Sequence, residues 1–423
     1  MVSKETTEIL EIEDFLSIKH IKWEIEKFNI ITGDIASGKS LCIKLTQFFE
    51  DIIPTLLISP YDDFLSYLEK SKNFYDSLDK TFNEIFVFRA AKNKKLSHFR
   101  IAYTFSYHKE IFSITVTGTN GTDIVFESPF LENLLSDWKE FVQKKDLYHP
   151  GKATPDGFRE MKLSFHNDLL QKFGGYFPIA TTFVPASRAA LAFASNHTDH
   201  HLKEYNQLVD FLPKYQCRNQ EIIKTILKAK MIFVSGFLHL ESDDGRIVPI
   251  SKASSGQQEI VYVLMMLDRL GNFYYTYGRH HSVFIEGPSA HLFPLEQKQT
   301  IELIVKIFNL LKGNGNPVRF FITTHSPYVL NSLNNCLTKG ALLDRYKDKE
   351  DEINNKFDIP YLKAYEISAL FINDDGKADN MLDMEENYMF ADKIAKISFD
   401  IDTITAELSQ FKNNLHGEKE LLD

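Results

Sequence analysis

The chain has 423 residues, of which 43% are hydrophobic and 25% are charged, a composition typical of a soluble globular protein with one large domain or two ordinary ones. The formal net charge of −10 excludes proteins that coat a nucleic-acid backbone wholesale, because that mode of binding needs a basic footprint. No apolar run reaches the roughly 18 residues of a membrane span. The N-terminal stretch lacks a signal-peptide core, and three widely spaced cysteines predict reduced thiols, so we expect a cytoplasmic protein without membrane contact.

The first part of the chain is predicted to contain short strands, two helical stretches and an antiparallel section. The strands cover residues 7 to 32, and an apolar-rich helix is expected from about 41 to 53. Apolar residues recur at helical spacing from 60 to 85. From 84 to 128 apolar and polar residues alternate with the strand period, and Asn120-Gly121 between two of these runs predicts a hairpin.

The remaining residues are predicted to alternate between helices and strands. In chain order we expect a mainly helical stretch over 129–175 with a polar loop near 149–158, a strand and a helix over 177–193, a helical stretch over 201–230, a hairpin around Asp243-Asp244-Gly245, a helix over 256–270, a strand over 282–286, a helix over 295–312, a strand over 318–325, and short strands before a charged helix at 401–415. Apolar strands that alternate with helices predict an α/β fold, with a mostly parallel sheet joined to the antiparallel section near 84–128.

Residues 33–40, GDIASGKS, match the phosphate-binding pattern G-x-x-x-x-G-K-[ST] without a mismatch. A predicted strand precedes them and a predicted helix follows, which is the context that this P-loop requires. Its glycines let backbone N–H groups turn onto phosphates at the positive end of the helix. In such a loop Lys39 reaches the β and γ phosphates, and the Ser40 hydroxyl binds Mg²⁺. The motif predicts binding of ATP, with these contact residues: Gly33, Ala36, Ser37, Gly38, Lys39 and Ser40.

Four further segments follow in a characteristic order. TTFVPASRAAL places Arg188 at a strand-to-helix junction, and KASSGQQEIVYVLMMLDRL places Ser255 and Gly256 at the start of an apolar helix. SVFIEGPSAHLFP ends a strand in Glu286, and FFITTHSPYVLNSL puts His325 just after another strand. With the P-loop, these segments resemble the ABC-type ATPases, in the soluble SMC/Rad50/OLD-like (AAA15/AAA21) branch. The resemblance covers most of residues 7 to 335.

The resemblance implies a P-loop NTPase fold of ABC type and an ATP site shared by two subunits. In that family two subunits sandwich two ATP molecules, and the signature helix of one subunit faces the ATP of the other. Ser255, as the N-cap of that helix, and Gly256 would then contact the γ-phosphate. Glu286, at the end of the Walker B strand, would order Mg²⁺ together with Ser40, and His325 would be the switch histidine that senses the γ-phosphate.

One position departs from the family pattern, and the role of another stays open. SSGQQ carries Gln257 where a second glycine is common in the signature. Arg188 resembles an arginine in a P-A-x-R segment of these ATPases, where a role beside the nucleotide and a plain surface salt bridge both remain open.

The residue after Glu286 is Gly287, where related sequences carry a second glutamate that orients or deprotonates the attacking water. Loss of a positioned base typically lowers a rate by roughly 10²- to 10⁴-fold. We therefore expect tight ATP binding, ATP-dependent pairing and slow hydrolysis, with His291 and His325 as alternative sources of a base. A natural clamp and an engineered substitution would look the same at this position.

Three other clusters have a functional and a plainer interpretation. Residues 88 to 100, FRAAKNKKLSHFR, offer a basic patch for DNA, although a solvated loop between strands is the favoured interpretation. HTDHH, from His197 to His201, suggests a metal site but favours a polar loop. Asp400 and Asp402 have the spacing of a TOPRIM nuclease, with Glu385 or Glu386 as partner, yet too few residues follow Pro360 for such a domain.

The resemblance also implies a division of the chain and a cellular role. We expect the ABC lobe over 1–128 and 231–335, a helical insertion over 129–230, and a C-terminal extension over 336–423 without TOPRIM. Similar stand-alone ATPases serve bacterial anti-phage defence systems of the PARIS, Septu and retron kinds, where a homodimer or larger homo-oligomer controls a separate nuclease or toxin. The alternative is a repair or recombination ATPase that clamps DNA, like Rad50 or RecF heads. A transporter subunit fits the soluble-branch motifs less well.

Overall fold

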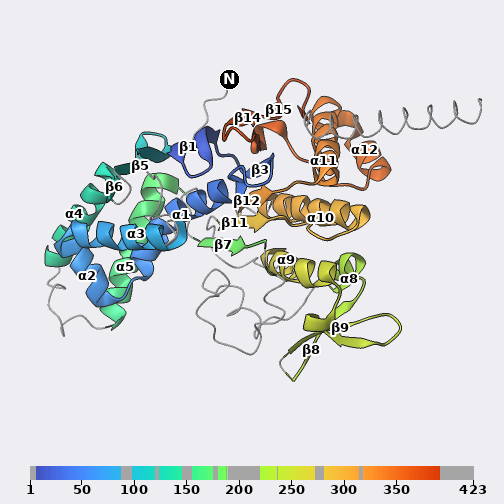
Figure 1. The fold of residues 1–423 in the computed structure, drawn as a ribbon, viewed down its shortest axis with the longest axis horizontal. Coiled ribbons are helices and arrows are strands. Elements are labelled where there is room, and N and C mark those ends of the chain that lie inside the picture. The colour runs from blue at the N-terminus through green and yellow to red at the C-terminus, as the bar shows by residue number, and fades with distance from the viewer. Residues whose placement is uncertain are drawn as a thin grey trace, which may run out of the picture.

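The computed structural model describes residues 6–86, 98–119, 123–144, 155–174, 180–186, 188, 220–235, 237–271, 281–313 and 318–390. Its centre is a six-stranded sheet in the order β14-β13-β3-β12-β11-β7, in which all neighbours are parallel except β13 and β14 (Figure 1). The strands are β3 (Phe28–Gly33), β7 (Ala180–Val184), β11 (His281–Glu286), β12 (Val318–Thr323), β13 (Ile367–Ile372) and β14 (Ala378–Asn380). The middle strands β3 and β12 are buried along their whole length, as expected of parallel strands covered on both faces.

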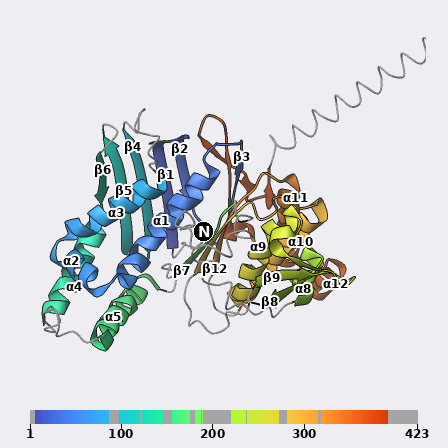
Figure 2. The ribbon, with the colours of Figure 1, turned by 60° about the horizontal axis from the view of Figure 1, so that its bottom comes forward.

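Helices cover the two faces of this sheet (Figure 2). Alternate residues of a strand pack into the core of one face or of the other. On β3, for example, Ile30 packs into the core of one face and Ile31 into the core of the other. The first face is covered by α9 (Ser255–Gly271), α10 (Pro294–Gly313) and α11 (Pro327–Arg345). The second face is covered by α1 (Lys39–Ile58). The helix that follows the P-loop is thus separated from the signature helix by the full thickness of the sheet.

An antiparallel sheet in the order β2-β1-β4-β5-β6 shares the second core with α1. Its strands are β1 (Thr6–Phe15), β2 (Ile18–Glu24), β4 (Phe99–Tyr107), β5 (Glu110–Thr119) and β6 (Asp123–Glu127). The same core receives α2 (Tyr61–Glu69), α3 (Ser71–Phe86), α4 (Pro129–Lys144) and α5 (Pro155–Phe173). Edge-on and offset phenylalanine rings fill it, such as Phe82 against Phe48 at 5.5 Å, which accounts for much of the heavy phenylalanine usage.

A small sheet and short C-terminal elements complete the described chain. The small sheet joins β8 (Lys230–Val234), β9 (Phe237–Glu241) and β10 (Ile247–Pro249), beside α8 (Gln220–Leu227). In Figure 1 β8 and β9 lie at the lower edge of the molecule. After α11 come α12 (Glu350–Lys356), the strands of the central sheet already named, and a two-stranded pair of β15 (Leu382–Asp383) and β16 (Tyr388–Met389).

The α/β class, the mixed sheet and the antiparallel section are confirmed, and so are the predicted helices over 60–85, 256–270 and 295–312. β5 and β6 pair on either side of Asn120-Gly121, although the turn itself lies outside the described residues. One local prediction is wrong: residues 84–86 belong to α3, because Phe82 and Phe86 complete its buried helical face. The polar loop near 149–158 ends sooner than predicted, since α5 begins at Pro155.

The predicted division of the chain does not follow the sheets. β13, from the supposed C-terminal extension, lies directly beside the P-loop strand β3, and β7, from the supposed insertion, forms the other end of the same sheet. α4 and α5 pack into the core of the antiparallel sheet. Segments distant in sequence therefore complete one sheet, which the order of motifs along the chain did not reveal. The predicted helix at 401–415 lies outside the described residues.

Candidate nucleotide site

The P-loop lies where β3 ends and α1 begins, at the carboxyl edge of the central sheet. Gly33 has a φ of 144°, and a Cβ there would lie 2.0 Å from the Ile372 carbonyl oxygen of β13, so only glycine fits. The backbone N–H of Asp34 donates to that same oxygen at 3.2 Å. Gly38 and Ala36 also have positive φ, which bends the chain into the compact loop that the motif requires.

Lys39 folds its side chain over this loop. Its Nζ donates to the carbonyl oxygens of Gly33 at 3.1 Å and Asp34 at 2.5 Å, and lies 3.4 Å from the Ser37 Oγ. Only 6% of the residue is exposed, and this burial lowers the pKa of the amine, with the charge of Asp34 opposing the change. Ser40, on the first turn of α1, is exposed. The amine and the hydroxyl thus belong to one turn of backbone, as phosphate and Mg²⁺ binding would need.

Glu286 lies two strands away on the same carboxyl edge, opposite Thr323 of β12, which in turn lies opposite Ile31 of β3. One carboxylate oxygen, Oε2, accepts a hydrogen bond from the Ala186 N–H at 3.0 Å. The other, Oε1, is buried and has no hydrogen-bond partner. A buried carboxylate oxygen without a partner is unfavourable in a folded protein, so its position calls for a cation or an ordered water.

This arrangement fits Mg²⁺. Within the described ranges no three His, Cys, Asp or Glu side chains gather into a metal cage. Mg²⁺ is commonly held by one or two protein oxygens, with waters and substrate phosphates as the remaining ligands. Glu286 and the Ser40 hydroxyl supply that kind of donor set, and bound Mg²⁺ would neutralise charge on the β and γ phosphates.

Gly287 turns the chain away from the strand. Its φ is +53°, a left-handed conformation that side chains rarely adopt, and its N–H donates to the Thr323 carbonyl oxygen at 3.0 Å. Among the described residues, the Ala290 Cβ at 3.9 Å is the one neighbour that a Cβ at this position would meet within 4 Å. Glycine therefore suits the turn, and a side chain here would meet a strained backbone conformation rather than a clash at its Cβ. The left-handed backbone at Gly287 favours glycine over a second glutamate, and the sequence alone did not show this conformation.

His325 follows β12, the strand between β3 and β11, and so lies between the P-loop and Glu286. Burial lowers the pKa of the imidazole, and the nearby positive charge of Lys39 lowers it further, while a hydrogen bond to the Gly33 backbone acts in the opposite direction. The ring therefore favours its neutral form at pH 7. The structure brings His325 into contact with the P-loop, as the predicted switch role requires.

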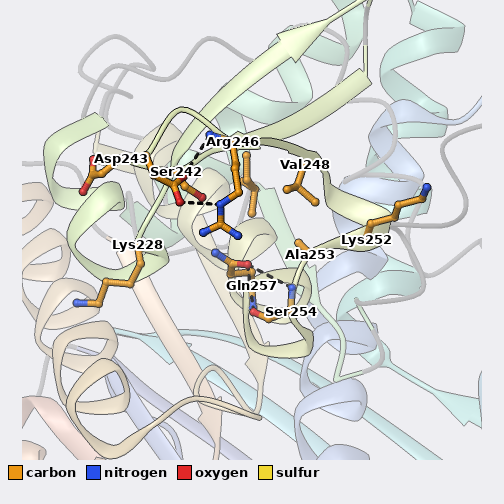
Figure 3. Close-up of a pocket in the computed structure, with 11 residues that line it drawn as sticks. Lys228, Ser242, Asp243, Arg246, Val248, Lys252, Ala253, Ser254 and Gln257 are labelled. Atoms are coloured by element: carbon orange, nitrogen blue, oxygen red, sulfur yellow. Dashed lines mark hydrogen bonds and ion pairs between the residues drawn. The ribbon is translucent and has the colours of Figure 1, made fainter.

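The signature helix α9 begins at Ser255, but its cap is Ser254, which corrects the predicted N-cap. The Ser254 Oγ accepts from the Gln257 N–H at 3.3 Å, and the Gln257 Oε1 accepts from the Ser254 N–H at 3.2 Å, a reciprocal capping box. Figure 3 shows this pair at the edge of a surface pocket that Arg246 and Lys252 also line. The glutamine in place of the common glycine thus has a structural use. Ser255 is left exposed on the first turn.

Gly256 allows the start of α9 to approach the segment after Walker B. A Cβ on Gly256 would lie 2.9 Å from the carbonyl oxygen of His291. His291, one of the two residues considered as an alternative base, is therefore placed beside the signature helix. Its backbone approaches α9, whereas His325 lies beside the P-loop.

Arg188 is not at the surface, and the predicted surface salt bridge is wrong. The residue is 0% exposed. Its nitrogens donate to four backbone carbonyl oxygens: those of Pro185 at 3.1 Å, Glu286 at 2.7 Å, Gly287 at 2.8 Å and Glu259 at 2.6 Å. The side chain is thus engaged with the protein itself. Glu259, which precedes the apolar run of α9, was not singled out in the sequence, although a lone charge before such a run was a visible signal.

Most of the other clusters predicted from the sequence lie outside the described residues. Arg100, at the end of the basic stretch, lies in β4 and pairs with Glu11 at 3.1 Å. Residues 88–97, the histidine cluster at 197–201, and Asp400 with Asp402 lie outside the described residues.

Of the cysteines, Cys42 and Cys336 are free and buried, and burial raises the pKa of each thiol to about 12. In the part of the chain that the structure covers, no helix is long and apolar enough to cross a membrane.

A glycine loop with a buried lysine, and an acid and a histidine on the same carboxyl edge of a mostly parallel sheet, define a P-loop ATPase of ABC type. Residues 61–330 match the family model AAA_15, described as AAA ATPase domain, and the chain belongs to this family. The matched range starts after the P-loop, so the loop itself is identified by its own sequence and geometry. No curated protein matches the chain in sequence.

Solved structures resemble the chain only distantly. An SMC head bound to the C-terminal winged-helix domain of ScpA is 14% identical, with 92% of this chain and 99% of that one covered, at a TM-score of 0.40. The SMC head domain from Thermotoga maritima is 11% identical, with 77% and 91% covered, at 0.35. The recombination mediator RecF with ATPrS is 12% identical, with 89% and 98% covered, at 0.33.

Proposed function

We propose that this ATPase binds ATP with Mg²⁺ at the P-loop, pairs with a second copy around the nucleotide, and hydrolyses it slowly. The proposal rests on the carboxyl end of the Walker B strand, β11. Glu286 presents a buried carboxylate oxygen with no partner, which suits an Mg²⁺ ligand, and the next residue has no side chain. The site thus has a candidate ligand for Mg²⁺, but it lacks the second carboxylate that would activate water.

Each of the remaining residues has a part in this state. Lys39 and the loop N–H groups would hold the β and γ phosphates, and Ser40 with Glu286 would hold Mg²⁺. Neutral His325 would sense the γ-phosphate from its position beside Gly33. Ser255, exposed at the start of α9, would contact the γ-phosphate of the ATP that the partner subunit binds. Such a pair persists for as long as ATP remains intact.

Steady-state phosphate release by the purified protein tests the slow-hydrolysis part. We expect the parent to match a Lys39→Ala blank, and Gly287→Glu to exceed it by about 10²-fold, as a restored general base would allow. Gly245→Glu is the matched control, because Gly245 also has positive φ and open space around it, but lies in the β9–β10 turn. A parent that hydrolyses ATP well above the blank would overturn the clamp.

In the cell, we propose that the ATP-held pair, or a larger homo-oligomer of it, is the sensor or scaffold subunit of a bacterial anti-phage defence complex and restrains a separate nuclease or toxin. A clamp with a long-lived ATP state suits restraint better than repeated motion. The measurement is co-purification with the product of a neighbouring gene, with and without ATP. The absence of any stable complex in both conditions would contradict this role.

The alternative, a DNA-clamping repair ATPase, receives less support from the described residues. Arg100, the one described basic side chain of the predicted 88–100 patch apart from His98, is engaged by Glu11. Titration of the ATP-bound protein with duplex DNA at several salt concentrations would distinguish the two roles. Tight binding that weakens steeply with salt would favour the DNA clamp.

A further inference from the structure

Arg188 connects three elements that carry the ATP site. Its carbonyl partners lie at the end of β7 (Pro185), at the end of β11 (Glu286 and Gly287) and in the second turn of the signature helix (Glu259). The Glu259 carboxylate lies 3.4 Å from the Arg188 Nε and adds a charge interaction. These partners are 71 to 99 residues away from Arg188 in sequence, apart from Pro185.

The same short segment also orients the Glu286 side chain. Ala186, two residues before Arg188, donates its N–H to the Glu286 Oε2 and leaves the Oε1 free of partners. Arg188 therefore holds the backbone of Glu286, and Ala186 holds one of its carboxylate oxygens. A planar guanidinium is suited to this task, because it donates in several fixed directions at once, whereas a lysine ammonium is a point charge on a flexible chain.

The first turn of α9 contains the exposed Ser255. The next turn contains Glu259, whose backbone carbonyl accepts a hydrogen bond from Arg188. A force on the start of α9 therefore reaches Glu286 through the rigid helix and one side chain.

We propose that Arg188 is a positioning residue that couples the signature helix to the metal-binding carboxylate of the same subunit. The inference rests on the proposed function, in which Ser255 faces the ATP of the partner subunit. Contact between Ser255 and that ATP then sets the position of Glu286, so that occupation of one ATP site adjusts the Mg²⁺ ligand at the other. The two sites of a pair act together through the two copies of Arg188.

Arg188→Lys tests the coupling when Mg²⁺ is titrated into the protein with a fluorescent, slowly hydrolysed ATP analogue, and pairing is followed by sedimentation. We expect the nucleotide affinity without Mg²⁺ to stay within about twofold of the parent. The apparent Mg²⁺ affinity and the stability of the ATP-dependent pair should each fall by about tenfold, as expected when an outer-shell partner of a metal ligand is lost.

Arg319→Lys is the matched control. Arg319 is also buried, at 5% exposed, but its partners are the carboxylates of Glu8 and Glu50 at the opposite edge of the sheet. This variant should lose thermal stability and keep the Mg²⁺ and pairing responses of the parent. Equal losses of both responses in the two variants would mean that general destabilisation is responsible, and would overturn the proposal.

A double-mutant cycle covers the case in which Arg188→Lys does not fold. Ser255→Ala and Glu286→Gln, singly and together, leave Arg188 in place, and their effects on pair stability should be less than additive if α9 and Glu286 are coupled. Additive effects would overturn the coupling. A parent with no ATP-dependent pairing at all would instead contradict the proposed function, so the two failures are distinguishable.

Discussion

Two buried arginines lie at opposite edges of the central sheet, and their partners differ in kind. Arg319, near the start of β12, bonds with the carboxylates of Glu8 and Glu50 and so ties the central sheet to β1 and α1. Arg188, at the carboxyl edge, donates to four backbone carbonyl oxygens of described residues and lies 3.4 Å from the Glu259 carboxylate. The first joins two layers through hydrogen bonds from the guanidinium to two carboxyl groups, of which the Glu50 Oε2 is also buried without a partner. The second leaves the neighbouring Glu286 with an oxygen available to a ligand.

This difference agrees with a general property of α/β proteins. Ligands bind at the carboxyl ends of parallel strands, where loops and helix N-termini meet, and the opposite edge is free to serve stability. The unpartnered Glu286 Oε1 and the compact P-loop lie at the carboxyl edge. At the opposite edge, Tyr103 also donates to the Glu8 Oε1 at 2.7 Å, and the Ser282 Oγ lies 3.1 Å from an Arg319 nitrogen. Three experiments test these differences.

The largest expected effect comes from Arg319→Met. Removal of the guanidinium leaves Glu8 and Glu50 buried without their cationic partner, and we expect the free energy of unfolding to fall by about 3–5 kcal/mol. Nucleotide affinity of the folded protein should not change, because the P-loop and Glu286 lie at the other edge. Denaturant unfolding and ATP-analogue titration measure the two quantities. A large loss of affinity in folded protein would show that the two edges are not independent.

A smaller effect is expected from pH acting on Glu50. Burial raises the pKa of this carboxyl to about 8, against the pull of Arg319, so the folded state keeps a proton that the unfolded state releases above its ordinary pKa. The free energy of unfolding should therefore fall as pH rises from about 5 to 8. Glu50→Gln should flatten this dependence.

Unfolding curves at several pH values for the parent and for Glu50→Gln provide that measurement. Asp51→Asn serves as the neighbouring control, because burial raises the pKa of Asp51 as well, to about 6, and its removal should flatten only the lower part of the range. If Glu50→Gln left the dependence between pH 6 and 8 unchanged, the proton would reside elsewhere.

The smallest expected effect concerns the signature. Gln257→Ala removes half of the capping box and a hydrogen bond to the Leu227 carbonyl oxygen, which should lower the free energy of unfolding by about 1 kcal/mol. Gln258→Ala, one residue on, is a comparison that leaves the box intact. ATP-dependent pairing should survive in both variants, since Ser255 is unchanged. Loss of pairing in Gln257→Ala alone would assign this glutamine to the ATP contact.

Much of the site could be predicted from the sequence, because its parts are local. The P-loop is a single run of eight residues, and Glu286 and His325 each follow an apolar strand directly. In a parallel sheet such strand ends meet at one edge, so the motifs alone imply their proximity. The antiparallel section and the main helices were also readable from periodicity.

Tertiary structure decided what depends on contacts between distant segments. The burial of Arg188, the pairing of Arg319 with Glu8 across 311 residues, and the place of β13 beside β3 have no local signal. Even the N-cap of α9 depended on which of two adjacent serines comes just before the first helical residue. The physical reason is the same in each case: sequence spacing determines which residues share a strand or helix, whereas burial and partner choice follow from the packing of whole elements against each other.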